Sequence, residues 1–208
     1  KELRGKEVKK VIIAFMGLLI FTVTLAAPSP VELLQNTSRQ LIAALQQNQA
    51  TLKTKPQIVY GIVNQILLPH VDLISMSSKA LGREAWLGAT PMQRQAFSRQ
   101  FVTLLIHTYS SALAQYTDEK VNFLPLRGNI NNQLRRVQVN SVIVRDTGPS
   151  INVSYHLMLE EGQWMLYDFS VDGVSMMASF RSQFAQELQQ SGIDGLVNKL
   201  AQHNAQNA

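Results

Sequence analysis

Hydrophobic residues in the first half of the chain recur at the spacing of an α-helix. They predict one helix over about residues 31–45 and a second over 58–66, which ends before Pro69 because proline cannot continue a helix. The supporting positions are Val31, Leu34, Leu41, Ile42 and Leu45 in the first helix, and Ile58, Ile62 and Ile66 in the second.

The longest predicted helix begins at Thr90-Pro91-Met92-Gln93. This tetrad is a capping box, in which the threonine and glutamine side chains satisfy free amides of the first turn, and it has proline at the first helical position. The helical pattern then continues to about Gln115. Its inner face reads Phe97, Phe101, Leu104, Leu105, Thr108 and Ala112.

Beyond residue 120 the hydrophobic residues alternate with polar ones, which indicates β-strands. The alternation predicts strands over 121–126, 137–144, 151–159 and 164–171. Turn sequences at Asp146-Thr147-Gly148-Pro149 and at Glu161-Gly162 separate the later strands, so we expect an antiparallel meander.

The second strand carries an irregularity in its pattern. Val137 and Val139 alternate with polar residues, but Val142 and Val144 continue one residue out of step. This slip predicts a β-bulge near Asn140-Ser141 and hence a bent strand.

Two further helices are predicted after the sheet, over about 174–190 and 193–202. Helices first, a sheet in the middle and helices again describe the α+β class. We expect a curved antiparallel sheet of about four strands, covered by helices on its concave face, with an apolar space between the two layers. That space is filled either by the protein's own side chains or by a ligand, and the pattern does not distinguish the two.

The beginning of the chain has the pattern of a secretory signal peptide. Lys1 to Lys10 holds five basic and two acidic residues, Val11 to Leu25 has no charge, and small residues precede Pro28. Cleavage is predicted after Ala26, because a cut after Ala27 would leave proline next to it. The alternative is an uncleaved membrane anchor, for which the uncharged run is at the short limit of about 20 residues. The predicted organisation is a signal peptide over 1–26, a single domain over 27–203 and a polar tail over 204–208.

Removing residues 1–26 lowers the net charge from +5 to +2, because this segment holds five basic and two acidic residues. The basicity of the chain is therefore not evidence for nucleic-acid binding, which requires a basic face on the folded domain. The chain has no cysteine, so thiol catalysis, thiolate metal sites and a lipidated N-terminal cysteine are excluded. We expect a soluble exported domain.

Candidate catalytic groups are few. The four histidines lie far apart without a metal-ligand spacing, and no phosphate-binding or nucleophile-elbow motif is present, so we expect no metal and no cofactor. Asp168 and Asp172 form the one carboxylate pair of interest. One of them acts as an acid or base together with His156, or Asp172 simply caps the following helix, and the second interpretation is favoured because no nucleophile accompanies the pair.

Several short motifs occur in an order that is characteristic of one family. In the first half they are Leu68-Pro69-His70-Val71-Asp72, Leu81-Gly82, Trp86 and Gln93-Arg94. In the second half they are Val153-x-Tyr155, Trp164-x-x-x-Asp168, Asp172-Gly173-Val174-Ser175, Phe180-Arg181-Ser182-x-Phe184 and Ile193-Asp194-Gly195-Leu196. From about Pro30 to Leu200 the chain resembles the MlaC family, also called the toluene-tolerance auxiliary family. Two residues depart from the family pattern, His70 in place of the commoner aromatic residue and Asp172 in place of glutamate.

The resemblance implies an NTF2-like α+β fold and a periplasmic phospholipid carrier without enzymatic activity. Such carriers shuttle phospholipid between an outer-membrane lipoprotein–porin complex and an inner-membrane ABC transporter, which maintains the lipid asymmetry of the outer membrane. The implied cargo is a phospholipid, with no cofactor. We expect a monomer, because no heptad repeat or self-complementary strand is visible.

The candidate lipid-binding residues are the inner-face positions of the predicted helices and strands. From the helices they are Ile62, Ile66, Phe97, Phe101, Leu104, Leu105 and Met176, and from the strands Val142, Val144, Val153, Tyr155, Leu157, Tyr167 and Phe169. The list rests on periodicity, which does not separate lipid contacts from core packing.

Two other functions remain open at this point. One is a hydratase or isomerase with a cone-shaped α+β fold, in which Asp168, Asp172 or His156 acts as the base on a small apolar substrate. The other is a periplasmic adaptor that binds no lipid and only bridges membrane complexes.

Overall fold

The computed structural model describes residues 29–52, 54–55, 57–114, 120–126, 135–145 and 148–206. The predicted signal peptide lies outside the described residues. The helices are α2 (Pro30–Gln47), α3 (Gln49–Leu52), α4 (Ile58–Ile66), the 3₁₀ turn η1 (Leu68–His70), α5 (Leu73–Leu81), α6 (Arg83–Gly88), α7 (Pro91–Ala114) and α8 (Met176–Gln206). The strands are β1 (Lys120–Phe123), β2 (Arg136–Val144), β3 (Ile151–Glu160), β4 (Gln163–Val171) and β5 (Val174–Ser175).

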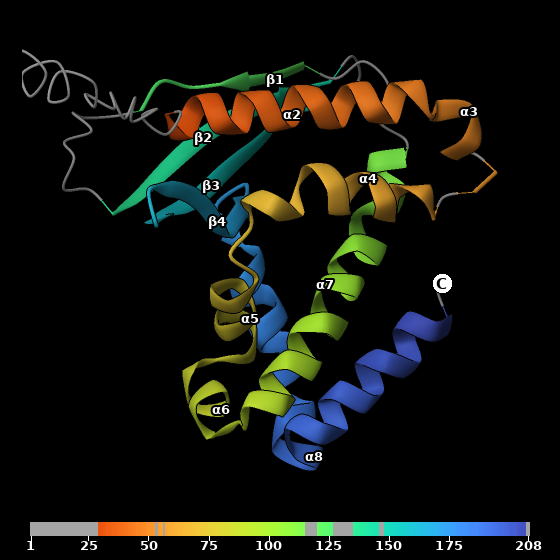
Figure 1. The fold of residues 1–208 in the computed structure, drawn as a ribbon, viewed down its shortest axis with the longest axis vertical. Coiled ribbons are helices and arrows are strands. Elements are labelled where there is room, and N and C mark those ends of the chain that lie inside the picture. Colours follow the sequence, from red (N-terminus) through yellow and green to blue (C-terminus); the bar gives the residue numbers. More distant parts are fainter. Residues whose placement is uncertain are drawn as a thin grey trace, which may run out of the picture.

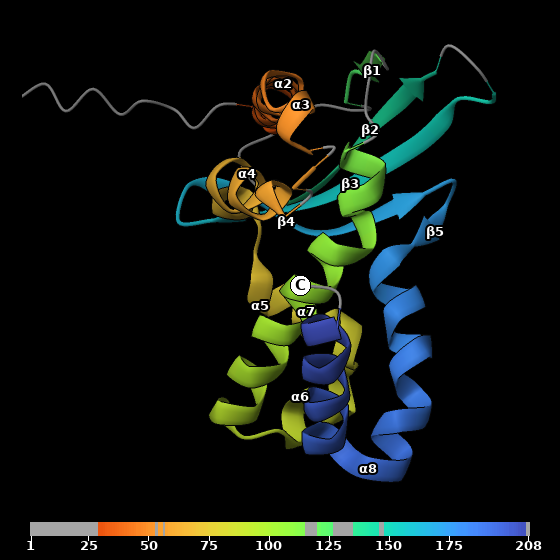
Figure 2. The same cartoon turned by 90° about the vertical axis from the view of Figure 1, so that its right-hand side faces the viewer.

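The molecule consists of an antiparallel sheet with helices on one face and a helical layer beyond one edge. Helices α2 and α4 lie next to each other across the sheet, while α5, α7 and α8 extend away from β4 (Figures 1 and 2). Helix α7 joins the two parts, because it contacts α4 near the sheet and α5 and α8 in the helical layer. The predicted α+β class is confirmed.

The sequence signals for helix starts are realised in the structure. The Thr90 hydroxyl accepts a hydrogen bond from the Gln93 amide at 3.3 Å, and the Gln93 side chain accepts one from the Thr90 amide at 2.9 Å, so the predicted capping box forms. A second capping box joins Ser29 and Glu32 at the start of α2. These caps fix where α2 and α7 begin and therefore the register of their apolar stripes.

The sheet has five strands in the order β1-β2-β3-β4-β5, and all neighbouring pairs are antiparallel. The meander prediction is confirmed, and the two-residue strand β5 adds to the four expected strands. The tight connection at Glu161-Gly162 has φ of 47° and 82°, and the one at Asp172-Gly173 has 46° and 83°. Both residues of each turn are left-handed, as in type I′ hairpin turns that match the twist of the strands.

The bulge predicted at Asn140-Ser141 is wrong. Strand β2 pairs with β3 in continuous register, and the only shift in that sheet region lies between β3 and β4, at His156/Leu157. The inner face of β2 continues through Ser141, which is 1% exposed and donates a hydrogen bond to the Tyr155 hydroxyl at 3.3 Å. A buried, hydrogen-bonded serine therefore occupies the position where alternation predicted an apolar residue.

The final helix differs from the prediction at both of its ends. It begins at Met176, and its backbone breaks at Gly192, where φ is 65°, as expected from the two predicted segments. It continues to Gln206, whereas we expected a polar tail from residue 204. Asn204 is 5% exposed and donates to the Gln100 carbonyl at 2.9 Å, which fixes the last turn against α7.

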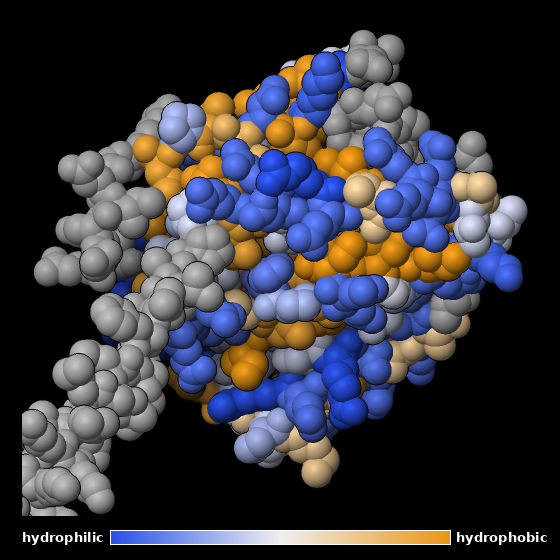
Figure 3. All heavy atoms as spheres, turned by 45° about the horizontal axis from the view of Figure 1, so that its top comes forward, coloured by the Kyte–Doolittle hydropathy of each residue, from blue (hydrophilic) through white to orange (hydrophobic). Residues whose placement is uncertain are grey.

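The hydrophobic core consists of two clusters that meet near η1. The larger one joins the inner face of the sheet to α5, α7 and α8, and the smaller one joins α2, α3 and α4 to α7. Hydrophobic side chains also reach the surface between hydrophilic bands on the face that carries α2 and α4 (Figure 3).

Candidate functional site

The inner face of the sheet gathers most of the strand residues predicted to bind lipid. Val153, Tyr155 and Leu157 follow one another on one face of β3, and Phe169 of β4 lies directly opposite Tyr155. Leu157 is fully buried, whereas Tyr155 and Phe169 are only half-buried and pack at the margin of the larger cluster. Half-buried aromatic rings on an inward face indicate that the helices do not cover this part of the sheet completely.

Aromatic and sulfur-containing side chains connect this face to α7 and α8. The rings of Tyr109 and Phe169 lie 5.9 Å apart, and the Tyr109 hydroxyl donates to the Met176 sulfur at 3.2 Å. Phe123 of β1 lies 5.8 Å from Tyr155. Burial raises the pKa of both tyrosines, so their hydroxyls stay neutral and suit an apolar surface. Tyr109 and Phe123 are not among the residues predicted to bind lipid. They are identified because the structure places their rings next to the inner face of the sheet.

The apolar stripe of α7 serves two different neighbours. Phe97 and Phe101 are fully buried and stack on each other at 5.5 Å, and both rings also contact Phe184 of α8 edge-on. One to two turns later, Leu104 is 9% exposed and Leu105 is half-buried at the margin of the sheet cluster. The structure thus separates Phe97 and Phe101, in the helical layer, from Leu105, near the sheet.

Ile62 and Ile66 of α4 lie in the smaller cluster. Ile62 is 8% exposed and contributes to its buried part, and Ile66 packs against that cluster while half-buried. The cluster includes residues of α2 and α7, so these isoleucines line the layer between the covering helices rather than the sheet itself.

Three of the predicted strand residues do not lie on the inner face of the sheet. Val142 and Val144 lie on the opposite face of β2, paired with Asn152 of β3 and Lys120 of β1, and Val144 is 39% exposed. Tyr167 occupies the β3–β4 irregularity, where its ring centre lies 5.3 Å from the Lys79 ammonium and 5.7 Å from the Arg136 guanidinium. Val142 and Val144 face the other way because β2 has no bulge. Tyr167 is displaced because β4 has an extra, unpaired residue opposite His156 and Leu157 of β3.

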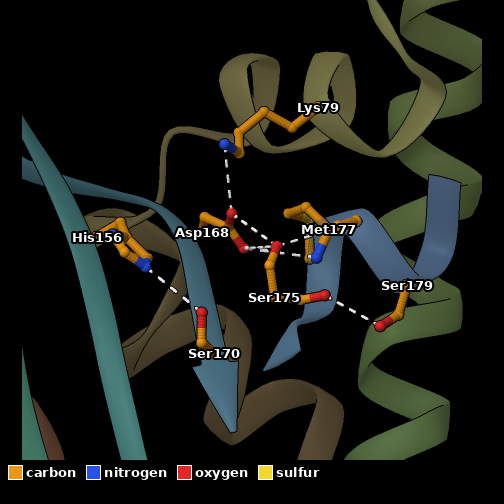
Figure 4. Close-up of polar contacts among 8 residues, drawn as sticks. Lys79, His156, Asp168, Ser170, Ser175, Met177 and Ser179 are labelled. Atoms are coloured by element: carbon orange, nitrogen blue, oxygen red, sulfur yellow. Dashed lines mark hydrogen bonds and ion pairs between the residues drawn. The ribbon is translucent and has the colours of Figure 1, made fainter. Parts of the chain in front are cut away.

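Asp168 holds a polar junction between α5, β4 and α8 (Figure 4). Its carboxylate is 5% exposed and lies 3.3 Å from the Lys79 ammonium. It also accepts hydrogen bonds from the Ser175 hydroxyl at 3.0 and 3.2 Å and from the Met177 amide at 3.4 Å. The Ser175 hydroxyl in turn accepts from the Ala178 amide at 3.1 Å, so Ser175, supported by Asp168, caps α8.

The predicted capping role of Asp172 is therefore wrong. Asp172 lies in the β4–β5 turn, where it accepts hydrogen bonds from the backbone and side chain of Asn152 at 3.0 and 3.2 Å. This turn reverses the chain so that β5 pairs with β4 before the helix begins. The capping residue of α8 is therefore Ser175, three residues after Asp172.

Two groups of the hydratase hypothesis, His156 and Asp168, lie opposite each other on β3 and β4, whereas the third, Asp172, lies apart in the β4–β5 turn. His156 points to the Ser170 hydroxyl, 3.4 Å from its Nε2, while Asp168 faces Lys79 and the start of α8 (Figure 4). Asp172 is exposed and lies at the far side of the hairpin. Both Asp168 oxygens contact structural partners, namely Lys79, Ser175 and Met177.

We expect His156 to make the stability of the folded protein depend on pH. Burial lowers the pKa of His156 below the usual 6.5, and the Lys79 charge adds to this, while Asp168 opposes it. The unfolded chain therefore takes up a proton first as the pH falls through about 6.5, so the free energy of unfolding should decrease between pH 7.5 and 5.5. Urea denaturation at both pH values should show a smaller decrease for His156→Gln than for the unchanged protein. An equal decrease in the two proteins would contradict this origin.

The described part of the chain contains no group of three His, Cys, Asp or Glu side chains arranged to hold a metal ion. No helix within the described ranges has the length and apolar character needed to cross a membrane.

Comparison with known proteins places this arrangement of sheet and helices in a family. The model of the family described as "MlaC protein" matches residues 35–202. The chain belongs to the MlaC family.

Relatives within the MlaC family are similar over most of their length. The chain is 29% identical over 184 residues to the toluene tolerance protein ttg2D of Pseudomonas putida, covering 86% of this chain and 84% of the relative. It is 28% identical over 189 residues to the intermembrane phospholipid transport system binding protein MlaC of Haemophilus influenzae, covering 90% and 88%. The solved structure of a phospholipid-binding protein from Ralstonia solanacearum, in complex with a phospholipid, superposes with a TM-score of 0.76 at 27% identity, covering 84% of this chain and 96% of that one.

Proposed function

We propose that this protein is a periplasmic phospholipid carrier, exported by a signal peptide over residues 1–26, and that it acts as a monomer without enzymatic activity or a cofactor. It exchanges lipid with an outer-membrane lipoprotein–porin complex and an inner-membrane ABC transporter, and so maintains outer-membrane lipid asymmetry. The observation that carries the proposal is the similarity in fold to a structure that holds a phospholipid, at 27% identity and a TM-score of 0.76. The name of the Haemophilus relative supports it.

The lipid-contacting surface in this proposal combines the incompletely covered inner face of the sheet with half-buried residues of the helices beside it. It comprises the half-buried apolar residues Ile66, Leu105, Tyr109, Phe123, Tyr155, Phe169 and Met176. We assign Phe97 and Phe101 to the core of the helical layer, because both are fully buried against aromatic rings. The buried residues beneath this surface do not contact lipid in this proposal but pack against the residues that do; they are Ile62, Leu104, Val153 and Leu157.

A carrier is needed because lipid leaves a membrane slowly. Burying a methylene group is worth about 0.8 kcal/mol, so two acyl chains of about 16 carbons resist transfer into water by more than 20 kcal/mol. The carrier must offer an apolar surface of comparable quality, and it must release the chains again. This chain has no nucleotide-binding motif, so the energy for directed transfer comes from the partner transporter.

Native mass spectrometry of the purified protein, followed by organic extraction, tests the proposal. We expect co-purified phospholipid, and uptake of phospholipid from liposomes by delipidated protein. Absence of both would refute the carrier and leave the lipid-free adaptor. Release of a chemically altered lipid or small substrate, lost on Asp168→Asn, would instead support an enzyme.

The lipid surface is tested by placing a charge on it. Phe169→Glu should reduce the retained phospholipid at least tenfold, because a carboxylate next to an acyl chain has to be desolvated without a partner. The matched control Val144→Glu places the same charge at an exposed position on the opposite face of the sheet and should keep its lipid. Lipid content per protein is measured by mass spectrometry, with circular dichroism as the check of folding. A folded Phe169→Glu protein with full lipid content would place the cargo elsewhere.

A further inference from the structure

A basic groove lies between α5 and α8, away from the inner face of the sheet. It has a volume of about 360 Å³, and it is lined by Ser78, Lys79, Arg83, Ser175, Ala178 and Arg181. Three of these six residues are cationic and none is acidic. The residues come from the last turn of α5, the start of α6, the end of β5 and the first turns of α8. A positive surface is thus assembled from segments about 100 residues apart in the sequence.

The charge of this groove is only partly compensated within the molecule. The Lys79 ammonium pairs with Asp168 at 3.3 Å, and its side chain is still 45% exposed. Arg83 and Arg181 are exposed and form no ion pair with any described residue. Glu84, the neighbour of Arg83 in the chain, does not line the groove. Like charges held close together repel, so the folded domain gains nothing by itself from placing them here.

Arg181 is positioned by its aliphatic stem. The stem lies against Gly82, so closely that a Cβ atom at that residue would be 3.3 Å from the Arg181 Cδ. Gly82 joins α5 to α6 with a φ of 88°, and Arg83 follows it directly. Arg83 and Arg181 therefore both lie next to the α5–α6 connection at Gly82. Such planar groups bind carboxylates through two parallel hydrogen bonds.

An exposed apolar side chain lies on the same helix face as part of the groove. Ile74, one helical turn before Ser78 in α5, is 68% exposed. Arginine combined with exposed apolar residues is typical of protein–protein interfaces. The surface is also concave, which suits an inserted protein segment, whereas a flat bilayer surface contacts convex parts of a protein.

We propose that the groove between α5 and α8 docks an acidic, partly apolar segment of a partner protein. Glutamate or aspartate carboxylates of the partner pair with Arg83 and Arg181, and its apolar residues contact Ile74. The proposal deepens the proposed function, since a carrier that exchanges lipid with membrane complexes needs a docking surface that leaves its lipid surface free.

The experiment uses the complete exported protein and a fluorescein-labelled peptide of three Glu-Ala-Asp-Leu repeats, with a Gln-Ala-Asn-Leu peptide as the uncharged probe. Fluorescence anisotropy should detect binding of the acidic peptide only, and this binding should weaken with added salt.

The double variant Arg83→Glu/Arg181→Glu should bind the acidic peptide roughly tenfold more weakly. The control Lys55→Glu/Arg99→Glu changes the net charge equally at exposed residues outside the groove, and it should bind within about twofold of the unchanged protein. Arg83→Gln/Arg181→Gln should show a smaller loss in the same direction.

Equal losses in the groove variant and the control would overturn the proposal, because they would indicate an effect of net charge alone. Groove-dependent binding to phosphatidylglycerol vesicles, without binding of the peptide, would also overturn it in favour of a membrane contact. The phospholipid content of each variant separates this proposal from the function. A groove variant that keeps its lipid but loses the peptide supports docking. An unchanged protein without lipid, whose peptide binding depends on the groove, supports docking while refuting the carrier.

Discussion

Phe101→Ala is expected to lower the free energy of unfolding by about 3–5 kcal/mol, which is a large part of the stability of a domain of this size. Phe101 is 0% exposed, and its ring lies 5.5 Å from Phe97, 5.2 Å from Phe180 and 5.9 Å from Phe184. Truncation leaves a cavity at the contact between α7 and α8 that the three neighbouring rings cannot fill by a small movement. Urea denaturation at neutral pH measures the loss.

Two comparison variants test whether the lost stability comes from the buried volume of the Phe101 side chain. Phe101→Leu keeps most of the buried volume, and we expect it to cost less than half as much as the alanine variant. Met92→Ala, in the first turn of the same helix, removes a side chain that is 78% exposed and should change stability by no more than about 0.5 kcal/mol. A loss below about 1 kcal/mol for Phe101→Ala would contradict the assignment of this ring to a rigid core.

Asp168→Ala is expected to cost about 2–4 kcal/mol, because it removes a buried acceptor of several hydrogen bonds at once. The Ser175 hydroxyl and the Met177 amide at the start of α8 both lose their partner. The ion pair contributes less, since the Lys79 side chain is 45% exposed and is well solvated without Asp168.

A comparison with Lys79→Met separates the two contributions. We expect this variant to cost less than about 1 kcal/mol, and Asp168→Asn to fall between the two, because the amide keeps one acceptor oxygen but loses the charge. Chemical denaturation of the three variants measures the order. If Lys79→Met were as harmful as Asp168→Ala, the ion pair and not the helix cap would be the main role of the carboxylate.

Local signals in the sequence predicted the elements whose causes are themselves local. The Thr90–Gln93 capping box and the Glu161-Gly162 turn are decided within four residues, and both form as expected. The bulge was misplaced because Ser141 is buried by a hydrogen bond to a residue of the next strand, which alternation along one strand does not reveal. The Asp172 cap failed for a similar reason, since Asn152 competes for its carboxylate.

The candidate site was predictable only in outline. Phe97, Phe101, Leu104 and Leu105 share one stripe of α7, and periodicity treats them as equivalent. The helix passes from the layer formed with α8 to the layer next to the sheet, so the same stripe provides core at one end and an incompletely covered surface at the other. The basic groove was not predictable, because Arg83 and Arg181 meet only after α5 and α8 have packed together.

The order of the strands has a consequence for how the chain folds. Within the described ranges each strand pairs with its neighbours in sequence, apart from a single bridge between Leu166 of β4 and Val71. The last two connections are two-residue turns, so the sheet forms mainly from contacts that close short loops. The larger cluster, in contrast, contains both Leu34 and Leu200, from opposite ends of the domain. Loop closure over such a distance is entropically slow. We therefore expect the inner face of the sheet to exist before α2 covers it, so that an apolar surface is open to a ligand while folding is still being completed.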